Sequence, residues 1–303
     1  MVALILAASL APLHAADLTN LACEYRENPL GIEAVKPRLS WIIEDRGQQP
    51  AVRGQKQTAY QVLVASTPEL LAKDTGDLWD SGKVASDQSI LVEYAGKPLA
   101  SRLRCHWKVR IWDKDEAVSA WSDGATWTMG LLTPDSWQAE WIGAVTKAEA
   151  ADLKPSATIQ LRKEFALDKE IRRAVAYVCG LGFYELRLNG QKVGDRVLDP
   201  GWTNYRKTCL YSAYDVTGQL SRGRNAIGVM LGNGMYNVPG GRYVKFTGSF
   251  GPPKVILHLY VEHADGTSTV VASDESWTWA PSPVVFSCIY GGEDYDARQE
   301  LPG

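Results

Sequence analysis

The sequence predicts an all-β protein made of two antiparallel β-sandwiches in tandem. Short runs rich in β-branched and aromatic residues recur along the whole chain, and turn residues separate them. Asn-Gly and Asp-Gly pairs stand between some of these runs, as expected for hairpins. The length of 303 residues suggests two domains rather than one.

The first sandwich is predicted over residues 17–131. One short helix is expected there, in TPELLAKD, with Thr67 as the N-cap and Glu69 in the first turn. Strands at this spacing over about 110 residues are typical of a small antiparallel sandwich. The expected strands lie in the runs PRLSWII, TAYQVLVAS, LRCHWKVRIWD and GATWTMG.

The second sandwich is predicted over residues 158–303 and is larger, with a jelly-roll-like arrangement. Asn189-Gly190 suits the two positive φ angles of a type I′ hairpin turn, and Asp265-Gly266 predicts a second hairpin. A linker is expected over residues 132–157, because that stretch has two prolines, an alanine-rich and acidic patch and little strand pattern.

The composition limits the classes of binding partner that can be expected. The formal charge of -3 gives no electrostatic reason to expect binding to nucleic acid or to an anionic membrane. Eleven Trp and thirteen Tyr stand against five Phe. Such amphipathic rings suit stacking on sugars, but Trp-rich sandwich cores give the same composition, so both interpretations stay open.

Residues 1–16 have the pattern of a signal peptide: an apolar run followed by small residues near Ala15 and Ala16. The run is too short to cross a bilayer, and no Lys or Arg precedes it. We therefore expect export to the periplasm or the extracellular space, with a buried first strand as the alternative. The five cysteines have wide spacings and no CxxC pair, so we expect no zinc site; most should be buried thiols, with a single disulfide as the open alternative.

Two clusters are candidates for binding. The loop at residues 231–246 offers Asn233, Tyr236 and Tyr243, whose amide and rings suit sugar hydroxyls and sugar faces. The alternative is a tightly turned loop that uses Gly and Asn for positive φ angles.

The other cluster contains Glu293 and Asp294, near the end of the chain, followed by Asp296. Two carboxylates two residues apart on a strand would lie about 7 Å apart, within the range of roughly 5–9.5 Å found in glycosidases. They would project in parallel, however, whereas an acid and a base must reach the bond from different positions. We expect no catalytic residue here, only contact with substrate from the side or a structural role.

Several ordered motifs together resemble the bacterial α-L-rhamnosidases of glycoside hydrolase family 78. GLGFYELRLNGQKVGDRVLDPGWTNYRKTCLYSAYDVT, NAIGVMLGNGMY and YGGEDYDAR resemble their N-terminal β-sandwich over residues 158–303. LACEYRENPLGIE, PRLSWII, YQVLVAS, LWDSGKV, HWKVRIWD and WSDGATWTMG resemble the fibronectin type III-like domain that precedes it, and EWIG at residues 140–143 is typical of the link.

The resemblance implies an enzyme that removes terminal α-L-rhamnose with inversion, using acidic residues in an (α/α)6 barrel further along the chain. YGGEDYDAR normally closes the N-terminal sandwich, so the sequence is expected to lack this barrel and to be inactive alone. The implied partners are carbohydrates, namely rhamnose-containing glycans, and the barrel itself.

A related jelly roll in this family binds rhamnose through calcium. CGLGF stands where acidic or amide ligands would be expected, and Met235 replaces the usual Trp of that loop; only Asn233 carries over. We expect no cofactor and no metal, with calcium as an open alternative. A free-standing rhamnose-binding protein and a structural adaptor are the alternative functions.

Overall fold

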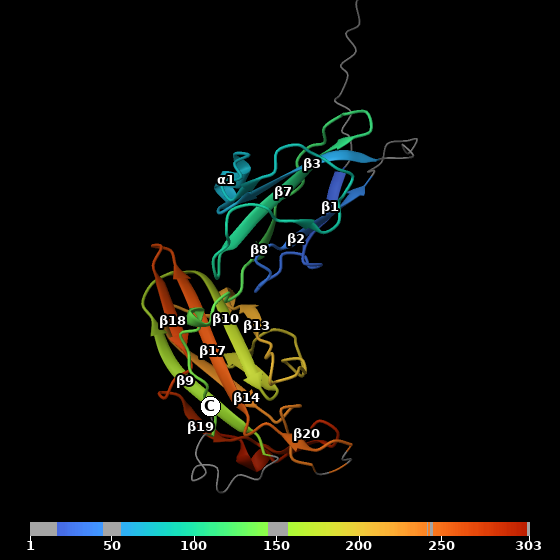
Figure 1. Cartoon of the computed structure of the whole chain (residues 1–303). Coiled ribbons are helices and arrows are strands. Elements are labelled where there is room, and N and C mark those ends of the chain that lie inside the picture. Colours follow the sequence, from blue (N-terminus) through green and yellow to red (C-terminus); the bar gives the residue numbers. More distant parts are fainter. Residues whose placement is uncertain (1–16, 45–55, 145–156, 241, 243–244, 302–303) are drawn as a thin grey trace, which may run out of the picture. The chain divides into compact units, whose positions relative to one another are not determined.

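The computed structural model describes residues 17–44, 56–144, 157–240, 242 and 245–301. The predicted signal peptide therefore lies outside the described residues. The chain divides into two units, residues 1–136 and 137–303, each with strands and a core of its own (Figure 1). Antiparallel sheets dominate both, which confirms the predicted all-β class of tandem sandwiches.

The first unit packs two sheets around a core rich in tryptophan. Trp41, Trp107 and Trp127 are almost fully buried between the sheets. The predicted helix forms, and the Thr67 hydroxyl caps it by accepting a hydrogen bond from the Leu70 amide at 3.3 Å. One sheet contains β1 (Asp17–Cys23), β2 (Arg38–Glu44) and β6 (Val92–Glu93); the other contains β3 (Gln57–Ala65), β4 (Trp79–Asp80), β5 (Val84–Ala85), β7 (Arg104–Asp113) and β8 (Ala125–Thr128), accompanied by α1 (Pro68–Ala72) and the 3-10 turn η1 (Pro134–Ser136).

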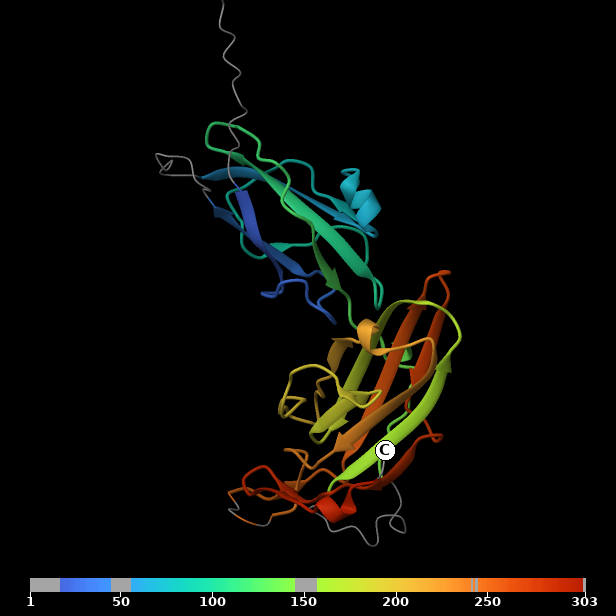
Figure 2. The same ribbon diagram turned by 180° about the vertical axis from the view of Figure 1, so that it is seen from behind.

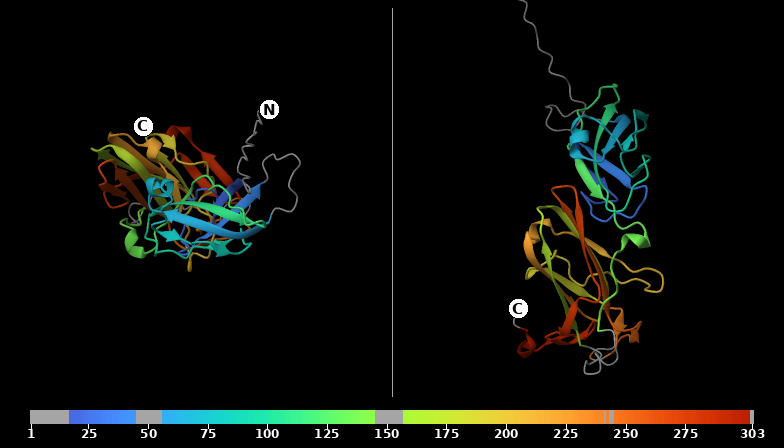
Figure 3. Two further views of the ribbon diagram at one scale, coloured as in Figure 1. Left: turned by 90° about the horizontal axis from the view of Figure 1, so that it is seen from above. Right: turned by 90° about the vertical axis from the view of Figure 1, so that its left-hand side faces the viewer.

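The second unit is a larger sandwich, and Figure 3 shows its strands in two layers. The four-stranded sheet has the order β13-β10-β17-β18 and the five-stranded sheet β12-β11-β14-β9-β19, with the core between them. The first comprises β10 (Ile171–Leu181), β13 (Ser212–Asp215), β17 (Lys254–His263) and β18 (Ser268–Ala272); the second comprises β9 (Ile159–Leu167), β11 (Tyr184–Leu188), β12 (Gln191–Lys192), β14 (Gly223–Leu231) and β19 (Thr278–Pro281).

Both predicted hairpins form. Asn189 and Gly190 have φ angles of 49° and 80° between β11 and β12, so the Asn-Gly pair supplies the two positive angles expected of it. Gly266 lies in the turn between β17 and β18. Two small hairpins complete the unit, β15 (Asn237–Val238) with β16 (Gly248–Ser249) and β20 (Val284–Cys288) with β21 (Gly292–Tyr295), together with the 3-10 turns η2 (Thr217–Gln219) and η3 (Ala297–Gln299).

The outer face of the four-stranded sheet is covered by the chain itself. Tyr177 and His258 are paired across β10 and β17, point away from the core and are nonetheless buried. Trp137 and Tyr211 pack their rings edge-on against them. Trp137 and the loop that leads into β13, which carries Tyr211, therefore cover this face.

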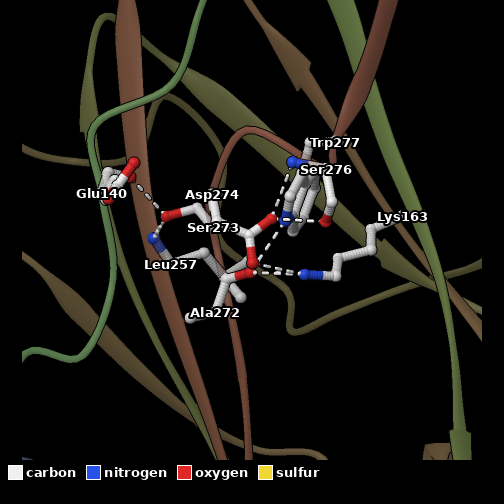
Figure 4. A network of polar contacts seen from close by, with 8 residues as sticks. All are labelled: Glu140, Lys163, Leu257, Ala272, Ser273, Asp274, Ser276 and Trp277. Carbon is white, nitrogen blue, oxygen red and sulfur yellow. Dashed lines mark hydrogen bonds and ion pairs between the residues drawn. The ribbon is translucent and has the colours of Figure 1, made fainter.

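The segment that follows Trp137 is held to the four-stranded sheet by hydrogen bonds. The Ser273 hydroxyl donates to the Glu140 carbonyl at 2.6 Å and accepts from the Leu257 amide at 2.9 Å, as Figure 4 shows. Ile142 exchanges backbone hydrogen bonds with Val255. Nearby, Lys163 binds Asp274 at 2.8 Å, and Asp274 also accepts from the amide and the hydroxyl of Ser276.

The loop between β12 and β13 is tied down by Asp199. One carboxylate oxygen accepts hydrogen bonds from the hydroxyls of Tyr184, Ser212 and Tyr214 at 2.8, 2.6 and 2.6 Å. Arg196 lies 3.7 Å from the other oxygen. Burial, and to a lesser degree Asp199, raises the pKa of Tyr214, so its hydroxyl stays a donor at neutral pH.

Asp274→Ala should destabilise the second unit by about 1 kcal/mol, because it leaves the half-buried Lys163 ammonium without its carboxylate partner. Burial opposes ionisation of Asp274, but hydrogen bonds from Lys163 and Ser276 outweigh it and lower the pKa from its ordinary 3.8. A carboxylate with a lowered pKa stabilises the fold above its unfolded pKa, and this contribution is lost as the pH falls through the folded pKa. Urea unfolding should therefore show a difference at pH 7 that shrinks below about pH 3.8.

Asp265→Ala is the matched control. Asp265 makes the same set of bonds, to Lys169 and to the amide and hydroxyl of Thr267, but both charged side chains are about half exposed. Its removal should cost clearly less. An equal loss in the two variants would contradict the role given to the burial of Lys163.

Asp199→Ala should destabilise the second unit by about 2–4 kcal/mol, because two buried tyrosine hydroxyls lose their acceptor. Asp215→Ala, which removes an exposed carboxylate whose hydrogen bonds among the described residues go to Thr217, is the control and should cost less than 1 kcal/mol. Denaturant unfolding followed by tryptophan fluorescence measures both. Equal midpoints for the two variants would show that the Asp199 bonds do not hold this loop.

Candidate functional site

The two clusters singled out in the sequence lie beside each other at one end of the second unit. Asn233 donates from its side-chain amide to the Ser287 carbonyl of β20 at 3.1 Å. Arg242, in the same loop as Asn233, binds Asp294 of β21 and lies over the Phe286 ring at 4.7 Å. Figure 1 shows this loop, in orange, next to the hairpin of β20 and β21 in red. The fold thus joins segments about 50 residues apart.

Asn233 is 1% exposed, and its side-chain amide forms hydrogen bonds within the protein. Its side-chain oxygen accepts from the Asn237 side chain at 2.6 Å, and its carbonyl accepts from the Asn237 amide at 3.1 Å. These bonds, together with the one to Ser287, close the turn that precedes β15. In this arrangement Asn233 shapes the loop.

Tyr236 belongs to a cluster of three aromatic rings. It stacks on Phe250 at 5.7 Å, and Tyr205 meets both rings edge-on at 5.2 and 5.4 Å. The Tyr236 hydroxyl donates to the Phe250 carbonyl at 3.2 Å. Tyr236 is buried whereas Phe250 is 44% exposed, so the face that this cluster offers to solvent is largely that of Phe250. Tyr243 lies outside the described residues.

Glu293 and Asp294 are neighbours on β21 and therefore project to opposite sides of the hairpin. Glu293 is exposed, opposite Ser287, while Asp294 is half-buried against Arg242. Asp296 lies beyond the strand, caps η3 and binds Arg298 at 2.7 Å. The hydrogen bond from Arg298 lowers the pKa of Asp296 to about 2, so this group is a carboxylate at neutral pH. A general acid of a glycosidase needs a raised pKa instead.

The loop between β12 and β13 holds exposed residues that the sequence reasoning did not single out. Its most exposed large hydrophobic residues are Val197, Leu198 and Trp202, at 76%, 64% and 64%. Figure 2 shows the loop in yellow, standing away from the sheets. Trp202 lies in a stretch with turn residues and no strand alternation, which was the available signal for an exposed ring.

Other sources of chemistry are limited in the described part of the chain. All five cysteines are free thiols. Burial raises the pKa of Cys105 and of Cys179 to about 12, which keeps them protonated and poorly nucleophilic. The described residues contain no group of three His, Cys, Asp or Glu side chains placed to hold a metal ion, and no helix among them is long and apolar enough to cross a membrane.

Family comparisons match both units. Residues 18–133 match the family model described as "Rha78A-like, N-terminal immunoglobulin domain". Residues 169–303 match the one described as "Alpha-L-rhamnosidase N-terminal domain".

Similar proteins are named α-L-rhamnosidases. The chain is 38% identical to one from Formosa agariphila over 94% of its own length and 32% of that protein's, and 38% identical to one from an Alteromonas species over 91% and 30%. The structure of the enzyme from "Dictyoglumus thermophilum" aligns with a TM-score of 0.82 and 40% identity, over 94% of this chain and 32% of that one.

The chain thus spans about a third of the length of the curated relatives that it matches. The structure of the Streptomyces avermitilis α-L-rhamnosidase complexed with L-rhamnose also aligns, with a TM-score of 0.81 and 27% identity, over 94% of this chain and 43% of that one. Two family models in consecutive order and these alignments agree with the resemblance seen in the sequence motifs. The chain therefore belongs, as an N-terminal region, to the α-L-rhamnosidases of glycoside hydrolase family 78.

Proposed function

We propose that this chain is the non-catalytic N-terminal portion of an exported enzyme that hydrolyses terminal α-L-rhamnose from glycosides or polysaccharides. One observation carries the proposal: the chain aligns almost throughout with α-L-rhamnosidases, but with only about a third of their length. The catalytic (α/α)6 barrel that the family resemblance implies would lie in the remainder. Export is supported by the signal-peptide pattern of residues 1–16.

The state of the carboxylates supports a non-catalytic role. Asp294 and Asp296 are each paired with an arginine, and Glu293 stands exposed on the other side of the hairpin from Asp294. An inverting glycosidase needs a protonated acid and a base that face each other about 6.5–9.5 Å apart, with water between. The hydrogen bond from Arg298 lowers the pKa of Asp296, which works against the acid role for that group.

A scaffolding role for the second unit is supported by its exposed apolar side chains. Val197, Leu198 and Trp202 gather in one loop, and this loop is held firmly at its base by Asp199. Large apolar side chains clustered on an anchored loop are typical of surfaces that another protein part covers. We propose the catalytic barrel as that part.

The isolated chain should release no p-nitrophenol from p-nitrophenyl α-L-rhamnoside above the no-enzyme rate, because the acid and base are not in it. The Streptomyces avermitilis α-L-rhamnosidase serves as the positive control. Release at a rate that Glu293→Gln or Asp294→Asn abolishes would overturn the non-catalytic role. Reading the coding sequence past Gly303 tests the scaffold separately, since an in-frame barrel is expected there and its absence would refute the proposal.

A further inference from the structure

A groove lies on the outer face of the five-stranded sheet, and none of the candidate residues discussed above lines it. Its volume is about 400 Å³, within the range of small-ligand sites. β9 and β14, which run side by side in Figure 2, supply its floor, and the chain after β21 supplies one wall. The side chains that line it and matter below are those of Arg162, Arg187, Met230, Pro283, Tyr295 and Glu300.

Gly228 forms a notch in the middle of this floor. In the sheet register Arg187 of β11 lies opposite Gly228 of β14, and Gly228 lies opposite Arg162 of β9. Strands are spaced by about 4.8 Å, so the two arginine backbones stand about 10 Å apart with no side chain between them.

The fold itself gives no reason for glycine at position 228. Gly228 does not have a positive φ angle. A Cβ atom built on it would meet nothing closer than the Leu161 carbonyl oxygen at 3.7 Å, which is ordinary contact. Glycine inside a central strand weakens the strand and often marks a place where a ligand approaches closely.

Each arginine beside the notch is paired with a carboxylate of opposite charge. Arg162 binds Glu164 at 2.7 Å and Arg187 binds Glu185 at 2.8 Å, each on its own strand. A guanidinium has five N–H donors, so both arginines keep donors beyond these bonds while their carboxylate partners hold them in place. Across the groove the Tyr295 hydroxyl donates to Glu300 at 2.5 Å.

Apolar surface completes the groove. Met230 and Pro283 line it, and the Tyr295 ring is 58% exposed at its edge. Glu300 lines the groove, and Glu164 and Glu185 are paired with the two arginines, so these carboxylates offset the guanidinium charges and we expect no preference for an anionic ligand. Paired charges, spare N–H donors and an exposed ring suit a ligand with many hydroxyls and an apolar face.

We propose that this groove is a binding site for one uncharged sugar residue, seated over Gly228 between Arg162 and Arg187. The choice of carbohydrate rests on the proposed function, whereas the location rests on the notch alone. The site is separate from Asn233, Tyr236, Glu293 and Asp294, which stay a prediction for carbohydrate contact.

The test is an NMR titration of the whole chain, labelled with ¹⁵N, with methyl α-L-rhamnoside up to tens of millimolar. Sodium D-glucuronate is the charged comparison. We expect saturable shifts of the Gly228 amide and of the arginine Nε–H signals with the uncharged sugar and weaker ones with glucuronate. No shift with the rhamnoside, stronger binding of glucuronate, or shifts confined to residues 231–250 would overturn the proposal.

Gly228→Ile is the blocking variant, since a β-branched side chain suits a central strand and would fill the notch. Binding should weaken at least tenfold while the unfolding midpoint is kept or raised. Gly218→Ile is the control, because a Cβ there meets nothing within 4 Å and the residue is outside the groove. Tyr295→Ala, which removes an exposed ring, is the second variant in case Gly228→Ile does not fold.

Unchanged binding in both Gly228→Ile and Tyr295→Ala would refute the site. These outcomes are independent of the proposed function, which is decided by the rhamnoside assay and the coding sequence. Loss of sugar binding would leave the N-terminal assignment standing. Rhamnosidase activity of the isolated chain would refute that assignment but would leave the proposed binding site in the groove unaffected.

Discussion

The arrangement of the second unit depends on burying both faces of the β10 and β17 pair. The inner face meets the core, but Tyr177 and His258 point outward and need a cover of their own. Trp137 and Tyr211 provide it, and each lies on a segment that polar bonds must hold in place. Ser273 fastens the first segment and Asp199 the second. The same second segment carries Tyr205, whose ring supports Tyr236 and Phe250, so the order of the candidate loop follows from this burial.

The five-stranded sheet differs, because one of its faces is turned toward solvent. Buried and partly exposed residues alternate along β14, as expected of a sheet with one face toward solvent. Among the described residues, Pro283, Tyr295 and residues 300–301 lie beside the groove on its outer face. In the central strand of this sheet, Gly228 lies in register between two arginines, and the packing of the sheet gives no reason for a glycine there.

Local features were predictable from the sequence, because their causes lie within a few residues. The Thr67 cap and the Asn189-Gly190 turn are decided by side chains next to the backbone groups that they serve. Other contacts join residues whose distance is set only by the complete fold. Examples are the hydrogen bonds that Asp199 accepts from Tyr184 and Tyr214, and the ion pair of Arg242 with Asp294. The cross-strand alignment of Arg187, Gly228 and Arg162 depends on the register of three strands, which cannot be predicted from a short motif.

The terminal carboxylates show how position on a strand limits chemistry. Glu293 and Asp294 are adjacent and therefore face opposite sides, so they cannot act together on one glycosidic bond. Asp294 and Asp296 are two apart, but each is bound to an arginine, and the hydrogen bond from Arg298 lowers the pKa of Asp296. Neither separation yields the facing geometry that bond cleavage requires. A hairpin of this length has no other carboxylates to offer, and within the described residues its acidic groups are better suited to holding the loop of Arg242 than to moving protons.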